Sequence, residues 1–232
     1  MPTSFPSSSL LHIDHDPIWG LAVQRIVHGW PEVRHAGLAA SATEGIARCR
    51  AACPDLVLLE LRLPDADGFE VVSTLAGLSR PPRILLLTGK SDDATLYRLT
   101  RLPVSGMVWK TGEIPAVLRK AVEEVLAGRR FFPADVREAL RTIRCDPSAF
   151  FKILSERELT MLPQLCLGFT DAQIARRAGL SPATVKSHRQ HIMSKLDLHR
   201  AADLVRWAAE KGFVDFLPVR RGPLPVLDPV KR

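Results

Sequence analysis

The sequence predicts an α/β domain with five β-α units around a doubly wound parallel sheet, followed by an all-α domain of four helices. Three observations support this prediction. In the first half of the chain, short apolar runs alternate with helix-compatible segments. Polar residues end or follow four of these runs, at the edge of a parallel sheet where ligands gather. The second half has no strand pattern and contains several residues typical of helix starts.

The predicted strands are short and nearly continuous in apolar residues. Four runs are strongly apolar and a fifth is weaker: Leu10–Ile13, Asp55–Glu60, Arg83–Thr88, Gly106–Trp109 and, as the weaker one, Arg34–Ala40. The helix-compatible segments are Ile18–His28, Thr43–Ala52, Gly68–Leu78, Asp92–Arg101 and Ile114–Ala127. Strands of this composition are buried on both faces, so the alternation favours a parallel sheet covered by helices on both sides.

The composition divides the chain into five regions. Residues 1–9 are rich in Pro and Ser and are expected to be disordered, and residues 10–127 hold the α/β domain. Residues 128–153 are expected to be a partly helical linker, because Pro133 can open a helix that ends near Arg144, before Asp146-Pro147. Residues 154–214 hold the helical domain, and residues 215–232 are expected to be a flexible basic tail.

The bulk properties exclude several classes of protein. Hydrophobic residues make up 46% of the chain, which argues against extensive disorder. No apolar run reaches the roughly 18–20 residues that span a bilayer, and the start lacks the order of a signal peptide. The four cysteines have no neighbouring His or Cys cluster that would complete a zinc site. We therefore expect a soluble cytoplasmic protein without disulfides and without membrane contact.

Positive charge is concentrated in the C-terminal part. Residues 150–232 contain 14 Lys+Arg against 8 Asp+Glu, whereas residues 1–127 contain 13 against 14. This distribution suits a polyanion bound by the C-terminal part, although charge alone fits a solvated basic surface equally well.

The helical domain carries a helix-turn-helix pattern. Its four predicted helices are Ser155–Leu167, Asp171–Ala178, Pro182–Leu196 and Arg200–Lys211. Ser155 with Glu158 forms a capping-box pattern, Thr170 and Ser181 are N-cap residues, and Gly179 supplies the turn between the second and third helices. Two helices joined by such a turn place the second helix in the major groove of DNA.

The third helix has two distinct faces. At 100° per residue, Val185, Ile192 and Leu196 point inward, while the opposite face has no carboxylate. We expect Lys186, Ser187 and Gln190 to read bases, with Lys186 donating to guanine and Gln190 pairing with adenine. The residues expected at DNA phosphates are Arg176, Arg177, Ser181, Thr184, Arg189 and Lys195. An ordinary amphipathic basic helix is the alternative, and the combined caps, turn and charge disfavour it.

These residues resemble a known family. The stretch LSERELTMLPQLCLGFTDAQIARRAGLSPATVKSHRQHIMSKLDL is similar to the output domain of NarL/LuxR-type regulators. The resemblance implies base contacts from Lys186, Ser187 and Gln190, and dimer contact through the helix Arg200–Lys211. The partners it implies are double-stranded DNA, with an inverted repeat as the expected site, and a second copy of the chain, bound through the receiver, the helix Arg200–Lys211 or both. RNA polymerase is a further candidate.

The first half resembles the receiver domain of two-component response regulators through IDHDP, PDLVLLELRLPDADGFE, RILLLTG and SGMVWK. In that family an Asp accepts a phosphoryl group, two acids hold Mg²⁺, and a Thr/Ser and a Lys complete the pocket. Asp14, Thr88 and Lys110 match. The acceptor position is Glu60, the second acid is replaced by His15, and Met107 stands at the aromatic switch position. Asp16, two residues after Asp14, could also reach the pocket.

The departures predict a degenerate receiver pocket. Imidazole removes a hard oxygen donor, so we expect weak or absent Mg²⁺ binding, and the longer Glu60 misplaces in-line attack. Three interpretations of Glu60 stay open: it mimics the phosphorylated state toward Thr88 and Lys110, it pairs with Lys110 or protonated His15 in place of a metal, or it is inert.

We therefore predict a DNA-binding transcription regulator that acts as a dimer without aspartyl phosphorylation. The alternatives are a regulator controlled by phosphorylation or by a small ligand, and an interaction module that sequesters a kinase or another regulator. Outside the altered pocket the sequence contains no nucleophile–base pair, phosphate loop or metal cluster, so we do not expect an enzyme.

Overall fold

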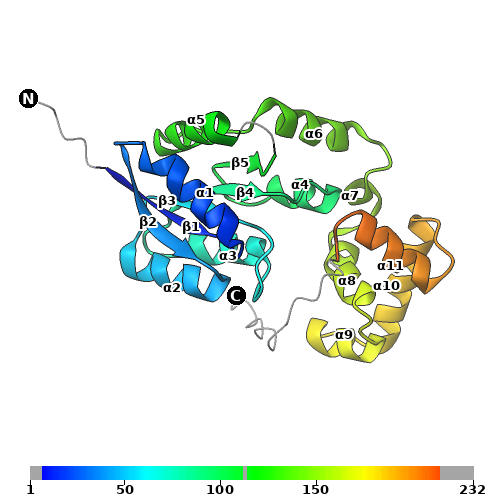
Figure 1. Ribbon diagram of the computed structural model, residues 1–232. Coiled ribbons are helices and arrows are strands. Elements are labelled where there is room, and N and C mark those ends of the chain that lie inside the picture. The colour runs from blue at the N-terminus through cyan, green and yellow to red at the C-terminus, as the bar shows by residue number, and fades with distance from the viewer. Residues whose placement is uncertain (1–6, 112–113, 215–232) are drawn as a thin grey trace, which may run out of the picture. The chain divides into compact units, whose positions relative to one another are not determined.

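The computed structural model describes residues 7–111 and 114–214, which form two compact units (Figure 1). Among these residues, the first unit contains 7–90, 101–111 and 114–136, and the second contains 91–100 and 137–214. The disorder expected for residues 1–6 and for the basic tail 215–232 concerns positions outside the described residues. Every described helix is too short or too polar to span a bilayer.

The first unit is built on a five-stranded parallel sheet. Its strands are β1 (Ser8–Ile13), β2 (Val33–Ala39), β3 (Leu56–Leu59), β4 (Arg83–Thr88) and β5 (Gly106–Trp109), in the order β2-β1-β3-β4-β5. The predicted doubly wound sheet is confirmed. The three central strands are buried almost throughout, as their apolar composition requires.

Strand β1 corrects one prediction. Ser8 and Ser9 were expected to belong to the disordered N-terminus, whereas they are the first two residues of β1. The Asp55 carboxylate anchors them, because it accepts hydrogen bonds from the Ser9 N–H (2.8 Å) and hydroxyl (2.9 Å). The Ser8 N–H also donates to the Glu32 carbonyl at 2.9 Å. Polar residues can thus begin a strand when a neighbouring segment satisfies them.

Helices cover both faces of the sheet (Figure 1). Helices α1 (Pro17–His28) and α5 (Ile114–Leu126) pack on one face, where Val23, Val27 and Leu118 join the inward residues of the strands. Helices α2 (Ala42–Ala52) and α3 (Gly68–Ala76) lie on the other face. This arrangement leaves the carboxyl edge of the strands open for polar side chains.

The second unit contains the C-terminal helices and one helix from within the α/β region. Its helices are α4 (Asp93–Leu99), α7 (Phe150–Ile153), α8 (Glu156–Cys166), α9 (Asp171–Ala178), α10 (Pro182–Lys195) and α11 (Ala201–Glu210). Helix α6 (Ala134–Cys145) begins in the first unit and continues into the second. The β-α alternation predicts α4 as part of the α/β domain, whereas its packing groups it with the C-terminal helices. The short helix α7 lies inside the segment predicted as a partly helical linker.

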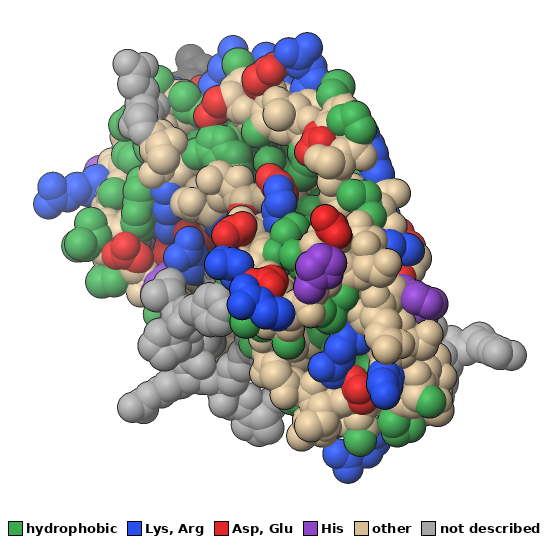
Figure 2. All heavy atoms as spheres, turned by 90° about the vertical axis from the view of Figure 1, so that its right-hand side faces the viewer, with side chains coloured by type: hydrophobic (Ala, Val, Ile, Leu, Met, Phe, Trp, Pro, Cys, Tyr) green, Lys and Arg blue, Asp and Glu red, His purple; other side chains and the backbone are tan. Residues whose placement is uncertain are grey.

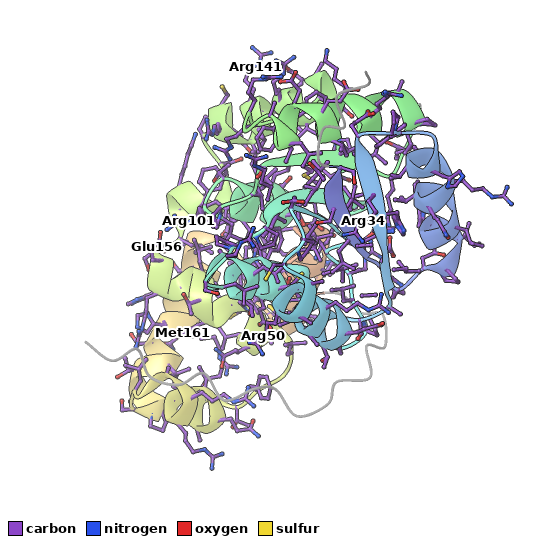
Figure 3. All side chains as sticks on the ribbon, turned by 90° about the vertical axis from the view of Figure 1, so that its left-hand side faces the viewer. Arg34, Arg50, Arg101, Arg141, Glu156 and Met161 are labelled. Carbon is purple, nitrogen blue, oxygen red and sulfur yellow. The ribbon has the colours of Figure 1, made fainter. Side chains whose placement is uncertain are left out.

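A separate core holds α8 to α11 together. Its fully buried members include Leu162, Ile174, Val185 and Ile192, one or more from each of α8, α9 and α10. Met161, labelled in Figure 3, is a further member and is 2% exposed. The four-helix arrangement predicted from the sequence is therefore confirmed, and the inward face of α10 contains the predicted Val185 and Ile192.

Candidate functional site

Four polar side chains meet at the carboxyl edge of the sheet. Asp14 follows β1, Glu60 follows β3, Thr88 ends β4 and Lys110 follows β5. Asp14 and Thr88 are 0% exposed, Glu60 is 5% exposed, and the Lys110 side chain is 8% exposed. The structure thus brings together four of the six residues predicted for this pocket.

Lys110 joins the two carboxylates. Its Nζ lies 2.6 Å from Asp14 Oδ2 and 2.7 Å from Glu60 Oε2. The ammonium also lies 5.2 Å from the centroid of the Trp19 ring, which covers it on one side. Moving such charges out of water costs free energy, and the pairing of Lys110 with the two carboxylates offsets part of that cost.

The Glu60 carboxylate is fully occupied by donors. Its Oε1 accepts hydrogen bonds from the Leu61 N–H (2.6 Å) and the Arg62 N–H (3.1 Å). The Thr88 hydroxyl donates to the same oxygen, and Lys110 holds the other oxygen. The Thr88 hydroxyl in turn accepts from the Lys90 N–H at 3.1 Å, so the β4–α4 connection is tied to the pocket.

A histidine that the sequence analysis did not single out lies beside Asp14. His12 Nε2 is 3.4 Å from Asp14 Oδ2, and both side chains are fully buried. Burial acts to raise the pKa of Asp14, but the His12 imidazole, the Lys110 ammonium and the Asp16 N–H outweigh it and hold that pKa below its usual value. The sequence does contain a signal for this position, because His12 is the polar residue within the apolar run Leu10–Ile13.

Three predicted positions lie at the margin of this cluster. The His15 side chain is 49% exposed, with Nδ1 3.9 Å from Asp14 Oδ1. Asp16 caps α1 by accepting from the Ile18 N–H at 2.9 Å. Met107 is buried in β5, next to Leu86 of β4. The structure therefore pairs Glu60 with Lys110 and Thr88 rather than with His15.

The residues at this pocket do not fit a bound Mg²⁺ ion. Mg²⁺ requires hard oxygen donors in near-octahedral geometry, whereas an ammonium group lies between Asp14 and Glu60. His15 offers a half-exposed imidazole where the second acid would be. Across residues 7–111 and 114–214, no group of three or more His, Cys, Asp or Glu side chains could hold a metal ion.

A second candidate site lies on α9 and α10. Thr170 forms a capping box with Gln173 at the start of α9. Gly179 adopts φ 65° and turns the chain, and Ser181 then caps α10 by accepting from the Thr184 N–H at 3.0 Å. Every cap predicted for these two helices is present, and together they fix the angle at which α10 leaves the turn.

The outward face of α10 is exposed. Lys186, Ser187 and Gln190 are exposed, while Val185 and Ile192 are 0% exposed. Figure 2 shows Lys and Arg side chains interspersed with Asp and Glu on one side of the molecule, without a single continuous cationic area. The predicted base-reading residues are thus available to a partner, while their neighbours anchor the helix.

The residues predicted at DNA phosphates fall into two groups. Arg176 and Arg177 are exposed on α9, with Arg177 lying 4.1 Å from the Phe169 ring centroid. The Ser181 and Thr184 hydroxyls lie 2.8 Å apart at the start of α10. By contrast, Arg189 is ion-paired with Asp171, and Lys195 with Glu158 at 2.8 Å.

Asp171 and Glu158 were not predicted as partners of these cations. Burial acts to raise the pKa of Glu158, but Lys195 and Ser155 lower it below its usual value. Arg189 and Lys195 therefore reach a polyanion only in competition with an internal carboxylate. Their role at phosphates stays a prediction.

Comparison with known proteins decides the family. The response regulator receiver domain family matches residues 10–123, and the luxR family of bacterial regulatory proteins matches residues 152–208. A Pseudomonas aeruginosa protein whose name marks it as a transcriptional regulator is 32% identical over 205 residues, covering 87% of this chain and 97% of that protein. The chain belongs to the LuxR-type response regulators.

Other proteins similar to this response regulator share a lower percentage of identical residues with it. The Fimbriae Z protein of Salmonella typhimurium is 28% identical over 202 residues, covering 87% of this chain and 96% of that protein. Among solved structures, RcsB from Salmonella enterica serovar Typhimurium, bound to the promoter rprA, has a TM-score of 0.64 at 22% identity and covers 88% of this chain and 98% of that chain. The response regulator ChrA has a TM-score of 0.53 at 24% identity, covering 90% of this chain and 100% of that chain. These structures support the fold.

Proposed function

We propose that this response regulator is a sequence-specific DNA-binding transcription regulator of the cytoplasm that acts as a dimer and does not depend on phosphorylation of its receiver. The observation that carries the proposal is the Glu60 carboxylate, which already binds Thr88 and Lys110. In the resembling receivers, residues matching Thr88 and Lys110 complete the phospho-acceptor pocket. Here the Glu60 carboxylate engages both of them.

The same geometry argues against phosphoryl transfer. Both Glu60 oxygens are held by donors, so neither is free to attack a phospho-donor in line. The pocket also has His15 in place of the second acid after β1, and the Lys110 ammonium lies between Asp14 and Glu60, where Mg²⁺ would need oxygen donors. Of the three interpretations of Glu60, its contact with Lys110 supports pairing in place of a metal, and its contact with Thr88 is also compatible with mimicry of the phosphorylated state.

The DNA partner is supported by α10 and by the relatives. Lys186, Ser187 and Gln190 form an exposed, carboxylate-free face on a helix that follows a capped turn. RcsB, whose fold is similar at 23% identity, is described in a complex with DNA and as two dimers bound to two parallel DNAs. We infer that this chain also binds duplex DNA as a dimer, with an inverted repeat as the expected site and RNA polymerase as a further candidate partner.

The test combines DNA footprinting with intact-mass measurement, each with and without acetyl phosphate and Mg²⁺. We expect the untreated chain to protect a duplex selected from a random-sequence pool, with affinity and mass unchanged by acetyl phosphate. Addition of a phosphoryl group to the unmodified chain would overturn phosphorylation independence. Capture of a kinase or another regulator without any footprint would instead support the interaction module.

A Glu60→Asp/His15→Asp double variant is the positive control. It restores the acceptor and the second acid, so we expect Mg²⁺-dependent phosphorylation of this variant. If the double variant gains no mass, the geometric explanation of the degenerate pocket is wrong.

A further inference from the structure

A cavity with an apolar floor lies at the amino edge of the sheet, whereas the pocket of Glu60 and Lys110 lies at the carboxyl edge. Ser8 and Val33, which line the cavity, are the first residues of β1 and β2. Trp30, between α1 and β2, and the last turns of α5 complete its walls. Its volume is about 320 Å³, at the lower end of the range for small-molecule sites.

The floor of this cavity reaches the core of the first unit. Trp30 and Val33 are each 7% exposed and Val122 is 1% exposed, and all three belong to the core that α1 and α5 form with the sheet. Leu126 is half-buried against the same core, and its carbonyl accepts a hydrogen bond from Arg83. An apolar group placed on this floor would leave water, which is the main favourable contribution to binding in such cavities.

Two carboxylates lie at the rim of the cavity. The side chains of Glu32 and Glu123 are 40% and 50% exposed. Arg119 spans them, with Nη2 3.0 Å from Glu32 Oε1 and Nε 2.9 Å from Glu123 Oε1. The guanidinium also lies 5.7 Å from the centroid of the Trp30 ring. Together the two carboxylates and the guanidinium carry one excess negative charge.

The position of Arg119 shows which kind of group this rim accepts. A cation that lies between carboxylates and over an indole ring has the surroundings in which proteins recognise ammonium groups. The pair of Arg119 with Glu123 joins residues one helical turn apart on α5, so it can persist without Glu32. The pair with Glu32 is exposed, and exposed ion pairs contribute little to stability. A ligand cation can therefore replace the guanidinium at Glu32 at low cost.

We infer that this cavity binds a small organic amine, whose apolar group lies on Trp30, Val33 and Val122 and whose protonated nitrogen pairs with Glu32. A neutral ligand of the same shape lacks the ion pair, and an anionic ligand meets the excess negative charge of the rim. Binding requires neither DNA nor a phosphoryl group, and the residues that carry it belong to the first unit.

Three probes of nearly equal size and different charge test the ligand class: phenethylamine, which is protonated at neutral pH, phenethyl alcohol and hydrocinnamate. Each is titrated into the full chain while NMR follows the indole N–H signal of Trp30, which a Trp30→Phe variant assigns. We expect a saturable shift with phenethylamine, with a Kd on the order of 1 mM for so small a ligand, and about tenfold weaker binding of the other two. Equal affinities for the three probes, or no saturable shift, would overturn the inference.

Glu32→Gln tests the proposed ion pair. It removes a charge but keeps the shape of an exposed side chain, so the variant is expected to fold. Affinity for phenethylamine should fall about fivefold, while affinity for phenethyl alcohol should stay the same. Glu124→Gln is the matched control, because it makes the same charge change on α5 where Glu124 Oε1 binds Arg129 Nη2 at 3.0 Å, outside the residues that line the cavity. Equal losses in the two variants would contradict the role of Glu32.

A second copy of the chain is the competing occupant of this cavity. Titrations at two protein concentrations separate the two cases, since a ligand site gives the same Kd at both. A Trp30 signal that shifts with protein concentration and not with phenethylamine would show that another copy covers the cavity, and would overturn the assignment. These titrations contain no DNA and no acetyl phosphate, so their failure leaves the proposed function intact, and a missing DNA footprint leaves the amine site intact.

Discussion

The receiver pocket and the exposed face of α10 differ in how their polar side chains are satisfied. In the pocket, Lys110, Asp14 and Glu60 are nearly inaccessible, and each is bound by another protein group within 2.7 Å. On α10, Lys186 and Gln190 are exposed, and the buried residues beneath them are apolar. The polar groups of the pocket are bound by one another, whereas Lys186 and Gln190 of α10 are exposed to solvent.

This difference predicts which substitutions should affect stability and which should affect DNA binding. A buried ion cluster affects stability strongly when one member is lost, because its partners stay buried and uncompensated. An exposed reading face affects recognition, with little effect on folding. We therefore expect substitutions in the pocket to act mainly on stability and substitutions on the exposed face of α10 to act mainly on DNA binding.

The largest expected effect is from Lys110→Met. It leaves Asp14 and Glu60 buried without their shared cation, so we expect the free energy of unfolding to fall by about 3–5 kcal/mol. Urea denaturation followed by far-UV circular dichroism measures it. Lys120→Met, at an exposed position of α5, is the matched control and should change stability by about 0.5 kcal/mol or less. Equal effects of the two substitutions would contradict the pocket's role.

On the recognition helix, Gln190→Ala and Lys186→Ala should each relax base preference at one position by about 1–3 kcal/mol. Quantitative binding to a library of single-base variants measures this. Arg176→Ala is the contrasting control, since a phosphate contact should weaken all sequences alike and lower the salt slope by about 1. A Gln190→Ala chain with unchanged base preference would exclude this reading face.

Arg189 tests whether a cation that is already paired within the domain contributes less to DNA binding than an exposed cation. Because Asp171 already holds its guanidinium, Arg189→Ala should weaken DNA binding less than Arg176→Ala and also destabilise the domain. Parallel affinity and thermal-unfolding measurements on the two variants separate these effects. A purely electrostatic loss without any loss of stability would show that the Asp171 pair does not stabilise the fold.

Local rules predicted much of this structure. The strand ends at Asp14, Glu60, Thr88 and Lys110 converge because parallel strands share one carboxyl edge. The caps at Ser155 and Ser181 depend only on residues three positions away. What the sequence could not predict involves distant partners: Ser9 bound by Asp55, and Arg189 by Asp171. Such pairings depend on how separate segments pack, which no local pattern encodes.

The pocket should also give a pH dependence of known sign. The pKa of Asp14 is lowered from 3.8 in the folded chain. The ionised Asp14 carboxylate therefore stabilises the folded chain fully above the pKa of the unfolded chain, and this stabilisation is lost as the pH falls through the lower pKa of the folded chain. We expect the free energy of unfolding to decline below about pH 4. Asp14→Asn should flatten this part of the profile when unfolding is followed between neutral pH and pH 3. A profile of identical slope in the variant would contradict the assignment.

The smallest effect is expected at a helix cap in the second region. Thr170→Ala removes the hydroxyl that accepts from the Gln173 N–H at 3.3 Å, so we expect a loss of about 1 kcal/mol in stability. Thr160→Ala is the matched control. The Thr160 hydroxyl only donates to the Glu156 carbonyl within α8, at 2.8 Å, and Ala is the better helix former there. Thermal unfolding of both variants should show a lower midpoint for Thr170→Ala alone. We also expect Thr170→Ala to lower DNA affinity without changing base preference, because α9 supports α10, the helix that we propose reads the bases.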